Sequence, residues 1–187
     1  ADTWTAAAFG RALTPGQTLI AGVFRIDGDR YFNSLSVLRR TTDGFAPLAI
    51  YDKHRLVPFG EYLPLEGLMG RLGLKKLAGV GDGFTAGPTP APITPAGLPP
   101  LQPLICYESL FPGFTGAQGE RPAWIVNVSN DAWFGRTSGP WQHLNLASYR
   151  AIEAGLPIVR STPTGVSAVI DIQEQKPRDR VRDRKSV

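Results

Sequence analysis

The sequence contains few of the residues that cross-link small proteins or bind metals. It has 1 cysteine and 2 histidines among 187 residues, so an internal disulfide is excluded, and Cys106, His54 and His143 alone do not make a zinc cluster. It also lacks the run of about 18 to 20 apolar residues that a membrane span requires, and a basic-then-apolar leader. Taken by itself, the chain is expected to be soluble and free of metal.

The excess of positive charge is confined to the C-terminal end. The formal net charge is +4, but residues 176–187 contain six basic and two acidic side chains, which leaves 14 of each sign in the rest of the chain. Nucleic-acid binding needs basic residues interleaved with aromatic ones on one surface, and this tail has no aromatic residue. We therefore expect no nucleic-acid partner and interpret residues 174–187 as a charged, disordered tail.

Short apolar runs predict a sheet-rich chain. Residues 18–26 and 31–38 are rich in β-forming side chains and flank Asp27-Gly28-Asp29, which is typical of a hairpin turn. Four further runs predict strands, the first three of them buried: residues 101–107, 123–129, 156–161 and 165–170.

One helix and one loop complete the pattern. Leu144, Ala147, Ala151 and Ala154 are three or four residues apart and precede Gly155 and Pro157, so residues 139–155 are predicted to be helical. Residues 87–103 contain seven prolines and are expected to form a long surface loop. Strands mixed with a helix and a hairpin favour a layered α/β fold.

Cys106 and Lys53 are the two residues whose chemistry suits a reactive site, and each has a glutamate nearby in the sequence. Cys106 follows an apolar run, at a predicted strand end, and Glu108 is ionisable in the same apolar setting. A lone cysteine is more often a small buried hydrophobe, so the residues alone leave a reactive and a structural role open. Lys53 lies among apolar side chains, and a buried charge needs a partner, for which Glu61 is the natural choice.

Three motifs in order carry a family resemblance. YDKHRLVPFGEYLP (51–64), ICYESLFP (105–112) and NVSNDAWFGRTSGPWQH (127–143) resemble the nitrilase superfamily, and the first and third resemble its apolipoprotein N-acyltransferase branch. The resemblance extends from about Thr18 to Asp171. It implies a four-layer α-β-β-α sandwich and acyl transfer through a thioester on the cysteine, with no cofactor.

Transferred motif by motif, the resemblance implies a set of roles. Cys106 matches the nucleophile and Lys53 the cation that favours the thiolate and the oxyanion. The backbone N–H of Tyr107 would complete the oxyanion hole, Glu61 would orient Lys53, and Glu108 would either support this network or only satisfy loop N–H groups. Asn130, Trp133 and Phe134 are candidates for lining the substrate cleft or, equally, for forming a packed turn.

The chain departs from the family pattern at one essential position. The family's general base is a glutamate after the first strand, and no glutamate precedes Glu61 here. We therefore expect residues 1–173 to be a partial catalytic domain that is incomplete at its N-terminus. In the isolated chain, we expect that phospholipid does not acylate Cys106. The resemblance further implies a phospholipid donor, a lipidated apolipoprotein acceptor, and membrane attachment through parts absent here, in a bacterial inner membrane facing the periplasm.

Two alternatives remain open from the sequence. A soluble amidase of the same superfamily would use the same residues with water as the acceptor, although apolar residues near Lys53 (Leu56, Val57, Phe59 and Leu63) suit a lipid chain. A truncated remnant without catalysis is the other alternative, and an unpaired central sheet edge would make it prone to aggregate.

Overall fold

The computed structural model describes residues 3–62, 83–114 and 119–172. The chain begins with helix α1 (Thr3–Ala12), followed by strands β1 (Thr18–Asp27), β2 (Arg30–Arg40) and β3 (Phe45–Asp52). The predicted hairpin is confirmed, because β1 and β2 pair antiparallel from Thr18–Arg39 to Asp27–Arg30, and Gly28 has the positive φ of 60° that this tight turn requires.

Strand β3 completes a three-stranded antiparallel sheet and was not predicted from the sequence. Its register against β2 shifts between Val37 and Leu38, whose partners are Ala49 and Pro47, so that Leu48 forms a bulge. Proline is tolerated at such an irregularity. The strand leads directly to the buried Lys53.

The second sheet has the order β4-β5-β6-β7. Strands β4 to β6 are parallel and β7 is antiparallel. Its strands and the two short 3-10 helices that follow the first two of them are β4 (Leu101–Ile105), η2 (Cys106–Leu110), β5 (Trp124–Val128), η3 (Asp131–Phe134), β6 (Ile158–Ser161) and β7 (Ala168–Ile170). The long helix α3 (Gly139–Ala154) connects η3 to β6.

Most of the predicted elements exist, with changed ends. The predicted helix is confirmed and stops at Ala154, because Gly155 adopts a left-handed C-cap. The predicted strand 101–107 stops at Ile105, where η2 begins, and β6 is only alternately buried, since Val159 is 37% exposed. Residues 87–100 contain no strand or helix, but Pro90 and Pro95 are buried, so this segment is not wholly a surface loop.

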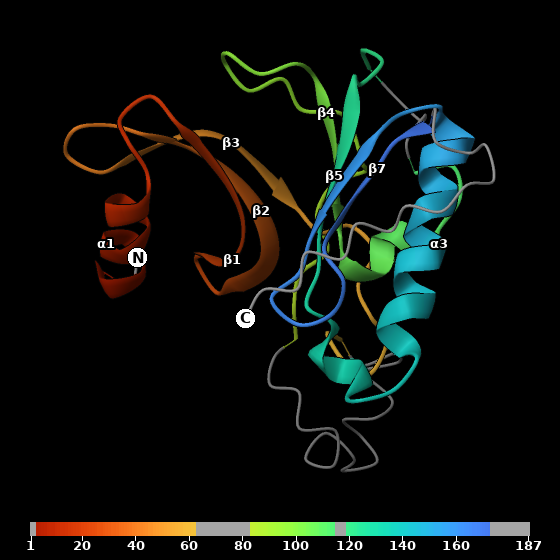
Figure 1. Cartoon of the computed structure of the whole chain (residues 1–187). Coiled ribbons are helices and arrows are strands. Elements are labelled where there is room, and N and C mark those ends of the chain that lie inside the picture. The colour runs from red at the N-terminus through yellow and green to blue at the C-terminus, as the bar shows by residue number, and fades with distance from the viewer. Residues whose placement is uncertain (1–2, 63–82, 115–118, 173–187) are drawn as a thin grey trace, which may run out of the picture.

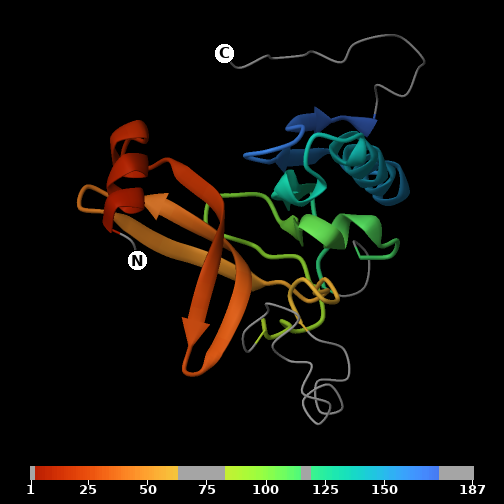
Figure 2. The ribbon, with the colours of Figure 1, turned by 90° about the horizontal axis from the view of Figure 1, so that it is seen from below.

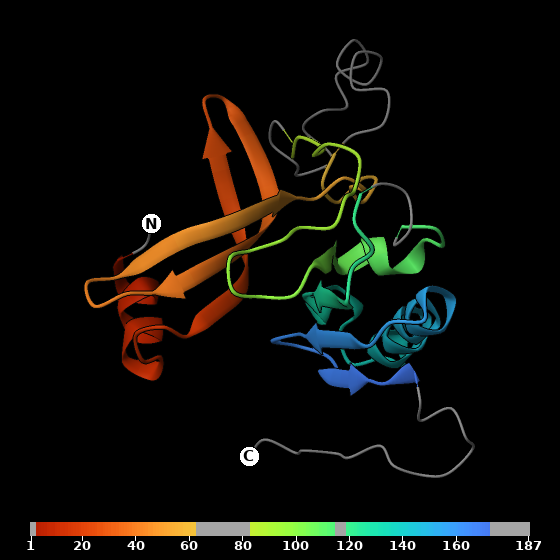
Figure 3. The same cartoon turned by 90° about the horizontal axis from the view of Figure 1, so that it is seen from above.

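The layers follow the predicted α-β-β-α order. Figure 1 shows α1, the β1–β3 sheet, the β4–β7 sheet and α3 in this order across the molecule, and Figures 2 and 3 show α1 and α3 on opposite sides. One apolar cluster lies between the sheets and includes Leu35, Val37, Tyr51, Leu101, Ile105 and Val126. A second lies between the β4–β7 sheet and α3 and includes Leu104, Ile125, Ala151, Leu156 and Ile158. The turn after β4 therefore lies where both cores meet.

Residues 61 and 84, which flank the segment 63–82, are hydrogen-bonded to each other. The N–H of Phe84 donates to the carbonyl of Glu61 (2.7 Å), and that of Thr85 donates to Tyr31 (2.7 Å). Leu63 and the tail 174–187 lie outside the described residues, so the prediction of a disordered tail stays a prediction, as does the assignment of residues 1–173 to one partial domain.

Candidate active site

Cys106 lies at the junction of β4 and η2. The expected place at a strand end is confirmed, and the residue is partly buried, with a backbone φ of 49°. A non-glycine residue in this left-handed region costs about 1–3 kcal/mol and persists only where its surroundings hold it. The strand-to-helix turn thus presents the thiol-bearing residue in a strained conformation.

Lys53 and Glu61 form a buried ion pair. The Lys53 Nζ donates to both carboxylate oxygens of Glu61 (2.9 and 2.7 Å), and Lys53 is 1% exposed. The same carboxylate accepts from the Asn33 side-chain amide and the Val57 N–H, both at 2.8 Å. The pairing predicted from the sequence is confirmed, and these contacts fix the ammonium group in one place.

Glu108 connects the Cys106 turn to the segment after Lys53. It is fully buried, and one carboxylate oxygen accepts from the Tyr51 hydroxyl (2.8 Å) and from the N–H groups of His54 (2.8 Å) and Arg55 (3.1 Å). The other accepts from the Ile105 N–H (2.8 Å). Burial raises the pKa of Glu108 against these hydrogen bonds, and burial also raises the pKa of Tyr51. Glu108 therefore does satisfy loop N–H groups, and these groups flank both Lys53 and Cys106.

We expect the Glu108→Gln variant to unfold with a free energy about 1–3 kcal/mol lower than the wild type, because an amide NH2 would face a backbone N–H donor and leave it unsatisfied. Urea denaturation measures this difference. The matched control is Glu120→Gln at an exposed loop position, where a change within about 0.5 kcal/mol is expected. Equal effects at the two positions would contradict the role of Glu108 as a clamp, that is, as the carboxylate that connects the Cys106 turn to the backbone after Lys53.

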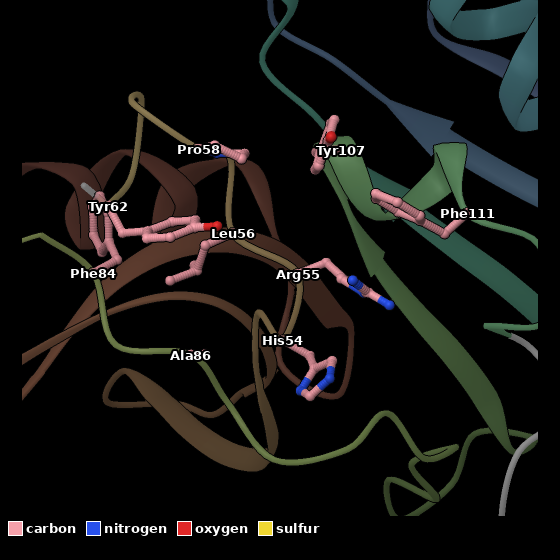
Figure 4. Close-up of a pocket in the computed structure, with 9 residues that line it drawn as sticks. All are labelled: His54, Arg55, Leu56, Pro58, Tyr62, Phe84, Ala86, Tyr107 and Phe111. Atoms are coloured by element: carbon pink, nitrogen blue, oxygen red, sulfur yellow. The ribbon is translucent and has the colours of Figure 1, made fainter. Parts of the chain in front are cut away.

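A cleft of about 590 Å³ opens beside this turn. Figure 4 shows Tyr107 of η2 and Phe111, the residue after η2, on one side and Leu56, Tyr62 and Phe84 on the other. Arg55 lies with its guanidinium group 5.0 Å from the centre of the Phe111 ring. The remaining lining residues are His54, Pro58 and Ala86. The lining combines aromatic and aliphatic side chains with the polar groups of Arg55, His54 and two tyrosines, so it can contact both an apolar chain and a polar group.

The third motif lies apart from this cleft. Asn130 caps η3 by accepting from the Ala132 N–H (3.1 Å) and also accepts from the Thr164 hydroxyl (2.8 Å). Trp133 is 78% exposed, and Phe134 packs edge-on against the ring of His143. None of the three is among the nine described residues that line the cleft, so their role as cleft residues stays a prediction.

The sequence did not predict a buried polar cluster that joins two residues of the third motif to Arg160. Asp131, His143 and Arg160 are 1%, 3% and 2% exposed. The Asp131 carboxylate accepts from His143 Nδ1 (2.9 Å), Arg160 (2.8 Å) and the Ser129 hydroxyl (2.8 Å). An arginine within the apolar run 156–161 was the available signal, since an inward arginine needs a buried acid.

Protonation of His143 provides a pH test of this cluster. Burial and the nearby Arg160 lower the pKa of His143 below its usual 6.5, against the opposing effect of Asp131. The unfolded chain therefore binds a proton near pH 6.5 that the folded chain does not, so stability falls as pH drops below 6.5 towards the lowered pKa. We expect a slope of up to about 1.4 kcal/mol per pH unit.

Urea unfolding between pH 7.5 and 5 measures this slope, and the His143→Gln variant isolates it, because glutamine does not titrate. His54→Gln is the matched control that should keep the slope. A wild-type slope that survives in His143→Gln would assign the pH dependence to other groups.

The described residues contain neither a group of metal-binding side chains nor a helix suited to a membrane. Across residues 3–62, 83–114 and 119–172, no three His, Cys, Asp or Glu side chains are grouped so as to hold a metal ion. In the same described ranges, no helix has the length and apolar character that crossing a membrane would need.

Comparison with known proteins identifies relatives that match most of this chain. The chain is 56% identical over 173 residues to an apolipoprotein N-acyltransferase of Caulobacter vibrioides, covering 90% of this chain and 32% of the relative. It is 49% identical over 166 residues to the protein of that name from Bradyrhizobium diazoefficiens, covering 85% and 30%. The chain thus spans about a third of the length of these relatives.

Two solved structures share the fold. An amidase from Nesterenkonia sp. matches with a TM-score of 0.52 at 21% identity, over 79% of this chain and 47% of the amidase. A carbon-nitrogen hydrolase from Helicobacter pylori matches with a TM-score of 0.56 at 17% identity, over 90% and 58%. The sequence profile of the carbon-nitrogen hydrolase family matches residues 2–175. The chain belongs to the carbon-nitrogen hydrolase family.

Proposed function

We propose that this chain is the catalytic segment of an apolipoprotein N-acyltransferase. The enzyme would move a fatty acyl group from a glycerophospholipid to the α-amino group of a lipidated N-terminal cysteine. The observation that carries the proposal is the clamp by Glu108, which ties the Cys106 turn to the backbone after Lys53 beside the cleft. The names and identities of the bacterial relatives support the choice of reaction.

In the first half-reaction, the Cys106 thiolate attacks the ester carbonyl of the phospholipid. A carbon–sulfur bond forms, and the negative charge moves to the carbonyl oxygen, where the Lys53 ammonium and the Tyr107 N–H would stabilise it. One such preorganised donor contributes on the order of 10²–10³ in rate. Collapse breaks the carbon–oxygen bond and expels the lysophospholipid alkoxide, which takes up the proton that the Cys106 thiol lost, and leaves a thioester on Cys106.

In the second half-reaction, the amine of the acceptor attacks the thioester carbonyl. The carbon–nitrogen bond forms, the carbon–sulfur bond breaks, and the proton that the nitrogen loses passes to the departing thiolate and restores the Cys106 thiol. This is a ping-pong sequence through one covalent intermediate. Glu61 acts by holding the Lys53 ammonium in place through two hydrogen bonds.

The same proposal gives the partners and location. The donor is a phospholipid, the acceptor is a lipidated apolipoprotein, and parts of the protein other than this segment would hold it in a bacterial inner membrane with the cleft towards the periplasm. A soluble amidase is the alternative class. The aromatic and aliphatic part of the cleft lining supports an acyl chain, and the names of the bacterial relatives support the acyltransferase over the amidase.

A chimera tests the proposal. The aligned region of this chain replaces the matching region of the Caulobacter relative, to which it is 56% identical. Incubation with phospholipid vesicles is expected to add the mass of one acyl group at Cys106, which a lipidated peptide amine then removes. Turnover of small amides with no acyl adduct from phospholipid would instead support the amidase alternative.

A further inference from the structure

Two side chains lie beside the backbone carbonyl of Cys106. The Ser109 hydroxyl donates to it at 2.9 Å, and His143 Nε2 lies 3.2 Å from the same oxygen. Ser109 belongs to η2 and His143 to α3, so the second side chain comes from a different layer of the fold. The Ser109 hydrogen bond restrains the residue whose φ of 49° is otherwise unfavourable.

The other ring nitrogen of His143 is also held by a side chain. Its Nδ1 lies 2.9 Å from the Asp131 carboxylate, which Arg160 of β6 contacts at 2.8 Å. Arg160 also donates to the side-chain oxygen of Asn127, whose amide nitrogen donates to the Leu104 carbonyl at 3.1 Å in β4. The chain of contacts therefore begins and ends within two residues of Cys106.

The acceptor character of Asp131 sets the protonation pattern of the ring. Nδ1 lies 2.9 Å from the Asp131 carboxylate, which only accepts, and 3.2 Å from Arg160 Nη2, which donates to Asp131 at the shorter distance of 2.8 Å. We therefore assign the hydrogen of the neutral imidazole to Nδ1, so that the lone pair of Nε2 faces the Ser109 hydroxyl at 3.1 Å. The single proton of Ser109 thus lies between Nε2 and the Cys106 carbonyl. This is the connectivity of a Ser-His-Asp triad, but Ser109 is fully buried, so no substrate reaches it as a nucleophile.

We propose that His143, held by Asp131 and Arg160, is a positioning residue that acts through Ser109 to hold the backbone of the Cys106 nucleophile in its strained conformation. The inference rests on the proposed nucleophilic role of Cys106. Orientation through a histidine that is fixed by a buried acid is a recurring arrangement at reactive sites. Here it acts on the backbone of the nucleophile and on no substrate atom.

The sole thiol of the chain allows a direct test on residues 1–187. Iodoacetamide alkylation at pH 7, followed by intact mass, reports on Cys106 alone. The folded wild type is expected to react roughly tenfold or more faster than the same chain in denaturant, as for an activated thiolate. In His143→Leu and in Ser109→Ala, the rate is expected to fall to within about twofold of the denatured chain, and His143→Gln, which keeps a polar group towards Ser109, is expected to recover part of it.

Leu156→Ala is the matched control. This residue is buried between the β4–β7 sheet and α3, and its truncation destabilises the fold without touching the polar chain, so its folded molecules should keep the wild-type rate. Wild-type rates in both His143→Leu and Ser109→Ala, with an activated wild type, would overturn the inference and leave the proposed function intact. A folded wild type no faster than the denatured chain would also overturn the inference, because His143 would then hold no reactive conformation, while the chimera tests the proposed function separately. Equal losses in Leu156→Ala and His143→Leu would reduce His143 to a packing residue and overturn the positioning role.

Discussion

Replacing Cys106 with alanine in the chimera is expected to lower the rate of acyl transfer about 10⁶-fold. Losses of this size follow when the nucleophile of a group of cooperating catalytic residues is removed. The physical reason is that no thioester can form, while Lys53 and Glu61 keep their mutual contacts. Release of labelled acyl product from phospholipid vesicles measures the rate, and mass spectrometry should find no acyl adduct.

The conservative Ser148→Ala variant on α3 controls for handling of the chimera. Its hydroxyl donates only to the Asn145 carbonyl in the same helix, so full activity is expected. Residual transfer above a hundredth of the wild-type rate in Cys106→Ala would show that another group carries the acyl chain, and the assignment of the nucleophile would be wrong.

The Glu61→Gln variant is expected to lose about 3–5 kcal/mol of unfolding free energy, because it leaves the Lys53 ammonium buried without a counter-charge. Lys53 is 1% exposed and donates to both oxygens of this carboxylate. Urea unfolding at pH 7 measures the loss. The double variant Lys53→Met with Glu61→Gln should regain a large part of it, since the unpaired charge is gone.

An exposed ion pair provides the comparison. Asp27 and Arg30 lie 2.8 Å apart across the hairpin turn, with side chains 51% and 60% exposed. Asp27→Asn is expected to change stability by no more than about 1 kcal/mol. A Glu61→Gln loss as small as that of Asp27→Asn would mean that water reaches Lys53, and the ammonium would not be held in a dry site.

Local sequence signals predicted those parts of the fold that local chemistry determines. The hairpin follows from two β-rich runs around Gly28, and α3 follows from alanines at helical spacing before Gly155. The contact between Lys53 and Glu61 followed from the cost of burying a charge. These features need no knowledge of distant segments.

Features that depend on distant segments were missed. A proline such as Pro47 is unfavourable within a strand, and pairing with β2 through a bulge at Leu48 accommodates it. Arg160, Asp131 and His143 come from three separate elements, so no local pattern brings them together. For Glu108 the sequence offered loop N–H groups as partners but not which ones, because three of its four donors belong to residues 51–55.

The N–H of Phe84 donates to the carbonyl of Glu61 (2.7 Å), so one wall of the cleft is attached to the residue that pairs with Lys53. Phe84 and its neighbour Tyr62 both line the cleft. A substitution that moves this wall therefore also disturbs the support of the buried ammonium group. Changes in what the cleft accepts are constrained by the need to keep the ion pair intact.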